Sequence, residues 1–141
     1  MTNTTSSSLG QIQALLARKQ YAVTELNSSV LSIREMESGI TLRAVLEDNI
    51  LFLSLVCAVL PASAITQEMM RKMLAADNGI STSHFQLYDT GKGELAITLN
   101  NFCKLQDMGP EDEDDILSCV SFLLADVVGA KDLIGSDLQT V

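Results

Sequence analysis

Apolar and polar positions alternate along several short stretches of the chain, which is the period-two pattern of half-buried strands. Residues 30–36 alternate weakly, and residues 40–46 alternate cleanly, with an apolar side chain at every second position. A turn-like Glu47-Asp48-Asn49 leads into an eleven-residue apolar run from Ile50 to Leu60. The short connections predict that these three segments form an antiparallel meander.

The apolar run at 50–60 could at first be taken for an export signal or a membrane span. A spanning helix needs about 20 apolar residues, and here Pro61 ends the run after eleven. A signal peptide begins at the N-terminus behind positive charge, whereas this run follows Glu47 and Asp48. Both alternating faces of the run are apolar. We therefore predict no integral membrane segment here, but a central strand that is covered on both sides.

Two helices are predicted around this meander. Ser8, followed three residues later by Gln11, has the capping-box pattern, so a first helix is expected from about Ser8 to Gln20 behind a disordered tail at 1–7. After Pro61, Ser63 or Thr66 is expected to cap a second helix that ends before Asn78-Gly79.

A hairpin and a third helix complete the pattern. Residues 84–88 and 94–99 alternate on either side of a Thr90-Gly91-Lys92-Gly93 turn. The third helix is expected to open at Pro110, with acidic residues 111–115 at the positive end of its dipole. Gly129 is expected to end or bend that helix, and residues 135–141 to form a short tail.

The predicted order of elements is α-β-β-β-α-β-β-α. Runs of strands separated by helices, without βαβ alternation, indicate an α+β fold in which helices pack on an antiparallel sheet. The length of 141 residues fits a single domain, which we place at residues 8–134.

The net charge of the chain limits the kinds of partner that it can bind. A formal net charge of −9 argues against nucleic acid and against an anionic membrane surface. It favours a basic or amphipathic segment of a protein partner. The N-terminal stretch MTNTTSSS carries no targeting pattern, so a cytoplasmic location is expected.

No residue pattern points to catalysis, a cofactor or a metal. His84 is the only histidine, and its place at the start of a strand favours a structural or surface role. Three cysteines, Cys57, Cys103 and Cys119, lie in apolar surroundings without a CxxC pair, which favours buried, reduced thiols over a zinc site. The acidic run at 111–115 lacks the spacing of a calcium loop.

Methionine and leucine residues on the first two helices suggest interaction surfaces. Met69, Met70 and Met73 lie on adjacent faces of the second helix. Methionine suits adaptable interfaces as well as irregular cores, so Met69 and Met73 are either core residues or part of a dimer or partner surface with Met70. On the first helix, Leu15 and Leu16 either cover the sheet or remain available to a partner.

The order of elements and the acidity resemble those of the class I type III secretion chaperones, over roughly residues 8–130. The stretch "LFLSLVCAVLPASAI" with the helix and strand pair after it resembles more narrowly the YjfI-type bacterial proteins of unknown function. The first resemblance implies a non-enzymatic homodimer that holds an extended segment of a partner. The second implies a link to envelope stress and a PspA-like protein as a candidate partner.

Together these observations predict a non-catalytic chaperone- or adaptor-like interaction module that is a homodimer and binds a protein partner. The alternative is a small-molecule sensor or enzyme with a pocket between sheet and helix, for which Tyr21, Tyr88 and His84 would be the polar groups.

Overall fold

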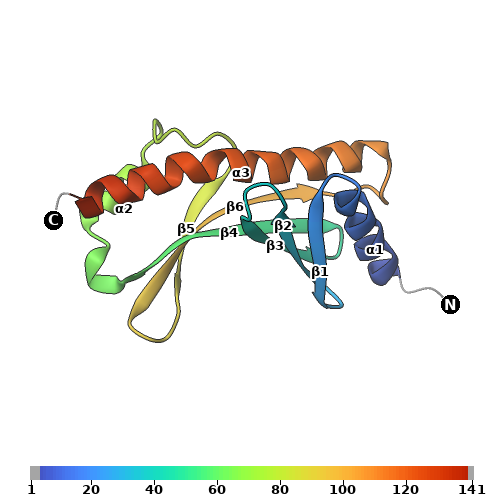
Figure 1. Ribbon diagram of the computed structural model, residues 1–141, viewed down its shortest axis with the longest axis horizontal. Helices are drawn as coiled ribbons and strands as arrows, with labels where there is room; N and C mark the ends of the chain where they lie inside the picture. The colour runs from blue at the N-terminus through green and yellow to red at the C-terminus, as the bar shows by residue number, and fades with distance from the viewer. Residues whose placement is uncertain (1–3, 140–141) are drawn as a thin grey trace. The chain divides into compact units, whose positions relative to one another are not determined.

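The computed structural model describes the backbone of residues 4–139 and the side chains of residues 8–135, and Figure 1 labels its elements. In chain order the elements are α1 (Thr4–Ala17), β1 (Tyr21–Asn27), β2 (Val30–Glu35), β3 (Thr41–Glu47), β4 (Ile50–Pro61), the 3₁₀ turn η1 (Ala62–Ala64), α2 (Gln67–Leu74), β5 (His84–Asp89), β6 (Glu94–Lys104) and α3 (Pro110–Gln139). The strands form a six-stranded antiparallel sheet in the order β1-β2-β3-β4-β6-β5. The predicted α+β fold is therefore confirmed.

The sheet contains one strand more than the sequence pattern predicts. β1 pairs antiparallel with β2, with Tyr21 opposite Glu35 and Val23 opposite Ile33. As an edge strand it buries little, because only Tyr21 and Val23 are even half-buried. A strand of this kind needs no apolar alternation, which explains why the pattern missed it.

The ends of α1 and α3 differ from the prediction. α1 already includes Ser8, so the prediction of an N-cap at Ser8 is wrong, and residues 4–7 of the predicted tail are helical. α3 continues through Gly129 and includes residues 135–139 of the other predicted tail. A glycine in a helix interior costs about 1 kcal/mol, and the buried Val127 and Ala130 on either side of Gly129 oppose a break there. Predictions for residues 1–3 and 140–141 lie outside the described residues.

The structure shows which of the two residues predicted as N-cap of α2, Ser63 or Thr66, takes that role. The Thr66 side chain accepts a hydrogen bond from the backbone N–H of Met69 at 3.1 Å, so Thr66 rather than Ser63 is the N-cap. The helix ends at Leu74, and the Asn78 side chain then donates to the carbonyl of Met73 at 2.6 Å.

The contacts of the chain divide it into two compact units. The first unit comprises residues 1–54 and 101–121, and the second comprises residues 55–100 and 122–141. The single domain over 8–134 stays a prediction.

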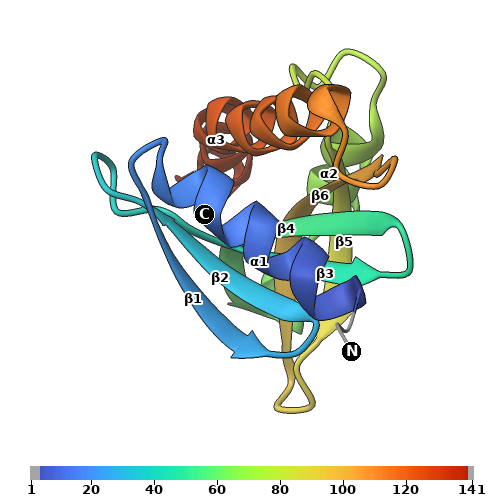
Figure 2. The ribbon, with the colours of Figure 1, turned by 90° about the vertical axis from the view of Figure 1, so that its right-hand side faces the viewer.

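The first unit has a closed core. Figure 2 shows α1 lying along one face of β1–β3. The apolar side chains that α1, β2 and β3 turn inward are at most 3% exposed: Leu9, Ile12, Leu15, Leu16, Leu31, Ile33, Leu42, Ala44 and Leu46. At the start of α3, the buried Asp112 carboxylate accepts hydrogen bonds from the backbone N–H groups of Gln106 at 2.7 Å and Gly109 at 3.2 Å. The core of the first unit is thus aliphatic and is built chiefly of leucine.

The second unit is built around α2, the β5–β6 hairpin and the second half of α3. Its loop between α2 and β5 is fastened to α3 by the buried Asp126 carboxylate. This carboxylate accepts hydrogen bonds from the backbone N–H of Ser81 at 3.2 Å and from its hydroxyl at 3.0 Å. The backbone N–H of Ala62 donates to the carbonyl of Gly93 at 3.0 Å, which connects η1 to the hairpin turn.

Candidate interaction surface

Strand β4 shows where the chain leaves apolar side chains uncovered. Leu51, Leu53 and Leu55 are buried, but Phe52 and Val56, which alternate with them, are 41% and 54% exposed. The prediction that this run is covered on both sides is therefore wrong. The alternation predicts only that both faces are apolar, and along residues 51–56 the face that carries Phe52 and Val56 is largely exposed.

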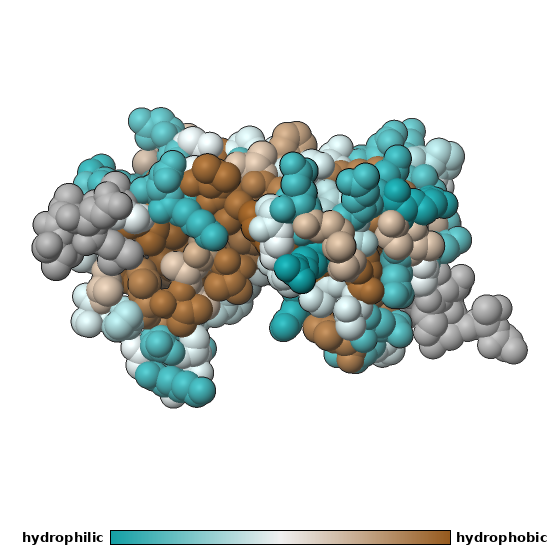
Figure 3. All heavy atoms as spheres, in the orientation of Figure 1, coloured by the Kyte–Doolittle hydropathy of each residue, from teal (hydrophilic) through white to brown (hydrophobic). Residues whose placement is uncertain are grey.

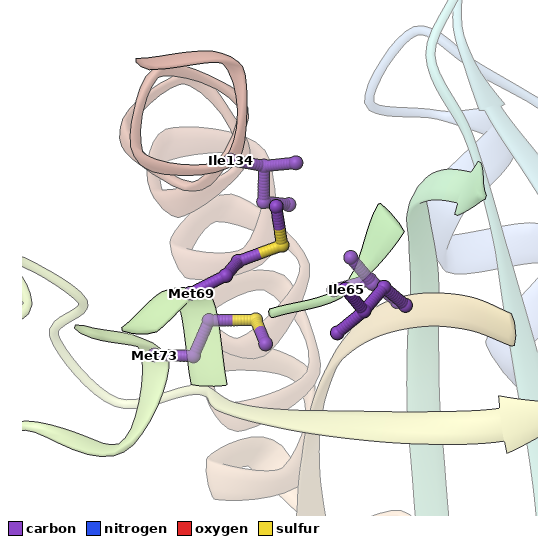
Figure 4. Packing of buried hydrophobic residues seen from close by; sticks show 5 residues of the cluster. Ile65, Met69, Met73 and Ile134 are labelled. Carbon is purple, nitrogen blue, oxygen red and sulfur yellow. The ribbon is translucent and has the colours of Figure 1, made fainter. Parts of the chain in front are cut away.

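The core of the second unit is only partly covered. Its buried members come from α2, β6, α3 and the segment that precedes α2, and Figure 4 shows Met69, Met73 and Ile65 lying close together, with Ile134 above them. The buried members are Ile65, Met69, Met73, Ile97 and Ile134. Other apolar side chains pack against this cluster but are only partly buried: Cys57, Ala58, Leu60, Met70, Phe85, Leu95 and Leu133. These partly buried side chains outnumber the buried members of the cluster.

Two exposed apolar side chains of β4 lie next to these residues along the strand. Val56 is 54% exposed and Val59 is 48% exposed, on either side of the partly buried Cys57 and Ala58. Figure 3 shows hydrophobic side chains gathered on the part of the molecule that contains β4 beyond residue 55 and the β5–β6 hairpin. We call Val56, Val59 and the seven partly buried side chains the open apolar surface.

The structure separates the residues predicted for a dimer or partner surface. Met69 and Met73 lie in the core of the second unit, in line with the core alternative, whereas Met70 is half-buried at its edge. Leu15 and Leu16 are buried inside the first unit. The most exposed apolar side chain of α2 is instead Leu74, at 80%. Sequence periodicity could not single it out, because it follows the buried Met73 directly.

The first unit carries a smaller apolar area of its own. The rings of Phe52 and Phe102 lie 6.2 Å apart between centroids at an interplanar angle of 42°, a favourable tilted geometry. Both rings are exposed, Phe102 by 58%. The sequence pattern does not predict this pair, since two single phenylalanines 50 positions apart carry no local signal.

The polar groups of the sensor alternative do not form one site in either unit. Tyr21 belongs to the first unit, where it is half-buried and lies beside the Ser121 side chain. His84 and Tyr88 lie in the second unit, on an exposed strand, and both contact the Gln86 side chain. Two hollows in the first unit, of about 140 and 210 Å³, are lined by none of these three residues. Both are smaller than the roughly 300–1,000 Å³ of typical small-molecule sites.

The cysteine and acidic residues have local structural explanations. All three cysteines are free, and burial is the main cause that raises the pKa of the Cys57 thiol to about 11. Among residues of the acidic run, Asp112 holds the loop before α3, as described above. Within the described part of the chain, no group of three or more His, Cys, Asp or Glu side chains is arranged to hold a metal ion.

Comparisons with known proteins identify the fold. No protein-family model and no curated protein matches the chain. Among solved structures, it is similar to YbjN from E. coli, described as a candidate transcription regulator, with a TM-score of 0.64 and 11% identity over 94% of this chain and 93% of that one. It is also similar to a chain of the ExsC–ExsE complex, with a TM-score of 0.59 and 13% identity over 92% of this chain and 95% of that one.

The fold is secretion-chaperone-like. At these identities the likeness shows the fold alone, and neither similar structure is described as an enzyme. Within residues 4–139, no helix combines the length and the apolar character that crossing a membrane requires.

Proposed function

We propose that this protein is a non-catalytic, chaperone- or adaptor-like module that binds a segment of a protein partner on the open apolar surface. The observation that carries the proposal is the partly covered core of the second unit, where more apolar side chains are half-buried around the cluster than buried in it. Large exposed apolar areas on globular proteins mark interaction sites. A bound segment would complete this core.

The charge of the chain indicates the chemistry of that segment. Eighteen acidic side chains stand against nine basic ones, and acidic residues outnumber basic ones in the sequence of each unit. A negatively charged surface attracts a basic partner and speeds their encounter. The proposed partner segment is therefore amphipathic, with apolar side chains for the open apolar surface and basic ones beside them.

The likeness to a chain of the ExsC–ExsE complex supports a protein as the partner, because that structure holds two different proteins together. We further propose a cytoplasmic homodimer, with α2 at the contact between copies. The exposed Leu74 and the half-buried Met70 supply its apolar side chains. The link to envelope stress and a PspA-like partner belong to this proposal as its narrowest form.

Affinity capture of the tagged protein from its native cytosol at low salt, with mass spectrometry of the eluate, tests partner binding. The expected result is one stoichiometric protein that is released as salt is raised, because ionic attraction between exposed charges is screened by salt. A Val56→Asp/Val59→Asp variant should lose at least tenfold in affinity for that protein. Its circular dichroism should remain that of the wild type, since both side chains are about half exposed.

His84→Ala is the matched control, because His84 lies exposed on β5, outside the open apolar surface. It should bind the partner as the wild type does. Retention of full affinity by the folded double aspartate variant would contradict the proposed site. Loss of binding in His84→Ala would instead place the partner on the exposed face of β5.

A further inference from the structure

Two thiols from distant parts of the sequence meet in the first unit. Cys103 lies near the end of β6 and Cys119 lies in the first half of α3, and the two thiols are close enough for each to change the pKa of the other. The Cys119 thiol also donates to the carbonyl of Phe102, with 3.7 Å between sulfur and oxygen. The Asn101 side chain donates to the carbonyl of Cys119 at 3.0 Å. These two hydrogen bonds hold β6 and α3 together beside Cys103.

The two thiols differ in burial and in acidity. Cys103 is buried, whereas Cys119 is half-buried and can be reached by a small solute. The interaction between them lowers the pKa of Cys119, against the opposing effects of burial and of Asp115. The same interaction raises the pKa of Cys103, and burial adds to that rise. Because Cys119 is the more exposed of the two thiols, it is the one that meets a solute first and supplies the thiolate, which is the nucleophilic form.

We infer that Cys103 and Cys119 are a peroxide-sensitive pair, which hydrogen peroxide converts to a disulfide that links β6 to α3. In the first step the Cys119 thiolate attacks one peroxide oxygen. A sulfur–oxygen bond forms, the oxygen–oxygen bond breaks, and hydroxide leaves. Cys119 is oxidised by two electrons to a sulfenic acid, and the peroxide is reduced.

In the second step the Cys103 sulfur attacks the Cys119 sulfur. The sulfur–sulfur bond forms, the sulfur–oxygen bond breaks, and the departing hydroxide takes the proton of Cys103 to become water. In sum, two thiols and one hydrogen peroxide give one disulfide and two waters. The product joins residues separated by 15 others along the chain, across a contact that already exists.

Peptide mapping of the full chain after treatment with one to ten equivalents of hydrogen peroxide tests this inference. Remaining thiols are alkylated under denaturing conditions before digestion with trypsin. Cleavage after Lys92, Lys104 and Lys131 separates the two cysteines, so the disulfide would appear as peptide 93–104 linked to peptide 105–131. The linked pair is the readout rather than the mass of the whole chain, because peroxide also oxidises methionine.

Three cysteine variants test which of the thiols take part in the reaction. Cys57→Ser should form the linked peptide at the wild-type rate, since the Cys57 thiol takes no part. Cys119→Ser should lose it. Cys103→Ser should leave a sulfenic acid at Cys119 that dimedone traps. Cys57 alkylated as completely after peroxide as before would confirm the selectivity in the wild-type chain, without any variant.

The inference is overturned if wild-type protein, folded by circular dichroism, yields no linked peptide while peroxide is consumed. It is also overturned if Cys57 is oxidised as fast as Cys119, or if dimedone labels Cys103 rather than Cys119.

Discussion

The anchor between Asp126 and Ser81 allows one stability prediction to be worked out in detail. The Asp126 side chain is 6% exposed, and its carboxylate accepts from both the backbone N–H and the hydroxyl of Ser81. A hydrogen bond to a charged group contributes roughly 1.5–3 kcal/mol. Two such bonds would together contribute roughly 3–6 kcal/mol. Because Ser81 is exposed, water can accept hydrogen bonds from its N–H and hydroxyl once the carboxylate is removed, which offsets part of this loss. We therefore expect Asp126→Ala to lower the free energy of unfolding by about 2–3 kcal/mol.

Two further variants separate the hydrogen bonds from other effects. Asp126→Asn keeps one oxygen acceptor without the charge and should cost only about 1 kcal/mol. Asp132→Ala removes an exposed carboxylate from the same helix and should change the stability by less than about 0.5 kcal/mol. A double-mutant cycle with Ser81→Ala should give a coupling free energy of about 1–2 kcal/mol, because the two side chains contact each other.

Urea unfolding followed by far-ultraviolet circular dichroism measures the stability of the single variants and of the Asp126→Ala/Ser81→Ala double variant, since the chain has no tryptophan to report on unfolding. If Asp126→Ala unfolds within 0.5 kcal/mol of the wild type, the carboxylate contributes nothing net and the reasoning fails. A coupling free energy near zero would mean that Asp126 acts through groups other than Ser81.

Three other predictions concern the second unit. The Cys57 thiol has a pKa of about 11, above its ordinary 9.0, so the stability it contributes is complete below pH 9 and is lost as the pH rises toward 11. Alkylation of Cys57 in a Cys103→Ser/Cys119→Ser variant should therefore accelerate only as the pH approaches 11, and a half-maximal rate near pH 9 would contradict this. Leu74→Asp and Met70→Asp should both turn the proposed dimer into monomers in sedimentation velocity; a Leu74→Asp dimer as tight as the wild type would remove α2 from the contact. On β4, Leu55→Ala should cost about 2–5 kcal/mol of stability in the isolated chain, whereas Val56→Thr should cost less than about 1 kcal/mol.

The sequence best predicts the elements in which one face is buried and the buried positions recur at a regular spacing. β3 alternates between exposed and buried side chains along nearly its whole length, as the pattern of residues 40–46 predicted. β1 was not predicted because it is an edge strand that buries almost nothing. The ends of α1 and α3 were predicted wrongly because helix ends depend on packing as well as on capping signals. The pairs Asp126–Ser81 and Cys103–Cys119 also carry no local signal, since they join residues 45 and 16 positions apart. Only the tertiary fold brings such pairs together.

Leu55 and Val56 show why the candidate surface in particular could not be predicted. Both are large, apolar and adjacent in one run, so hydropathy gives them the same expectation of burial. Yet Leu55 is 1% exposed and Val56 is 54% exposed, because neighbours along a strand point to opposite faces.

An apolar side chain on a face that its own chain leaves open adds little to the stability of the isolated chain, so Val56→Thr should be nearly neutral in urea unfolding. The same substitution introduces a hydroxyl that a bound apolar segment would have to desolvate, so it should weaken partner binding by about 1 kcal/mol or more. If Val56→Thr costs as much stability as Leu55→Ala and leaves binding unchanged, Val56 belongs to the core rather than to the surface for a partner.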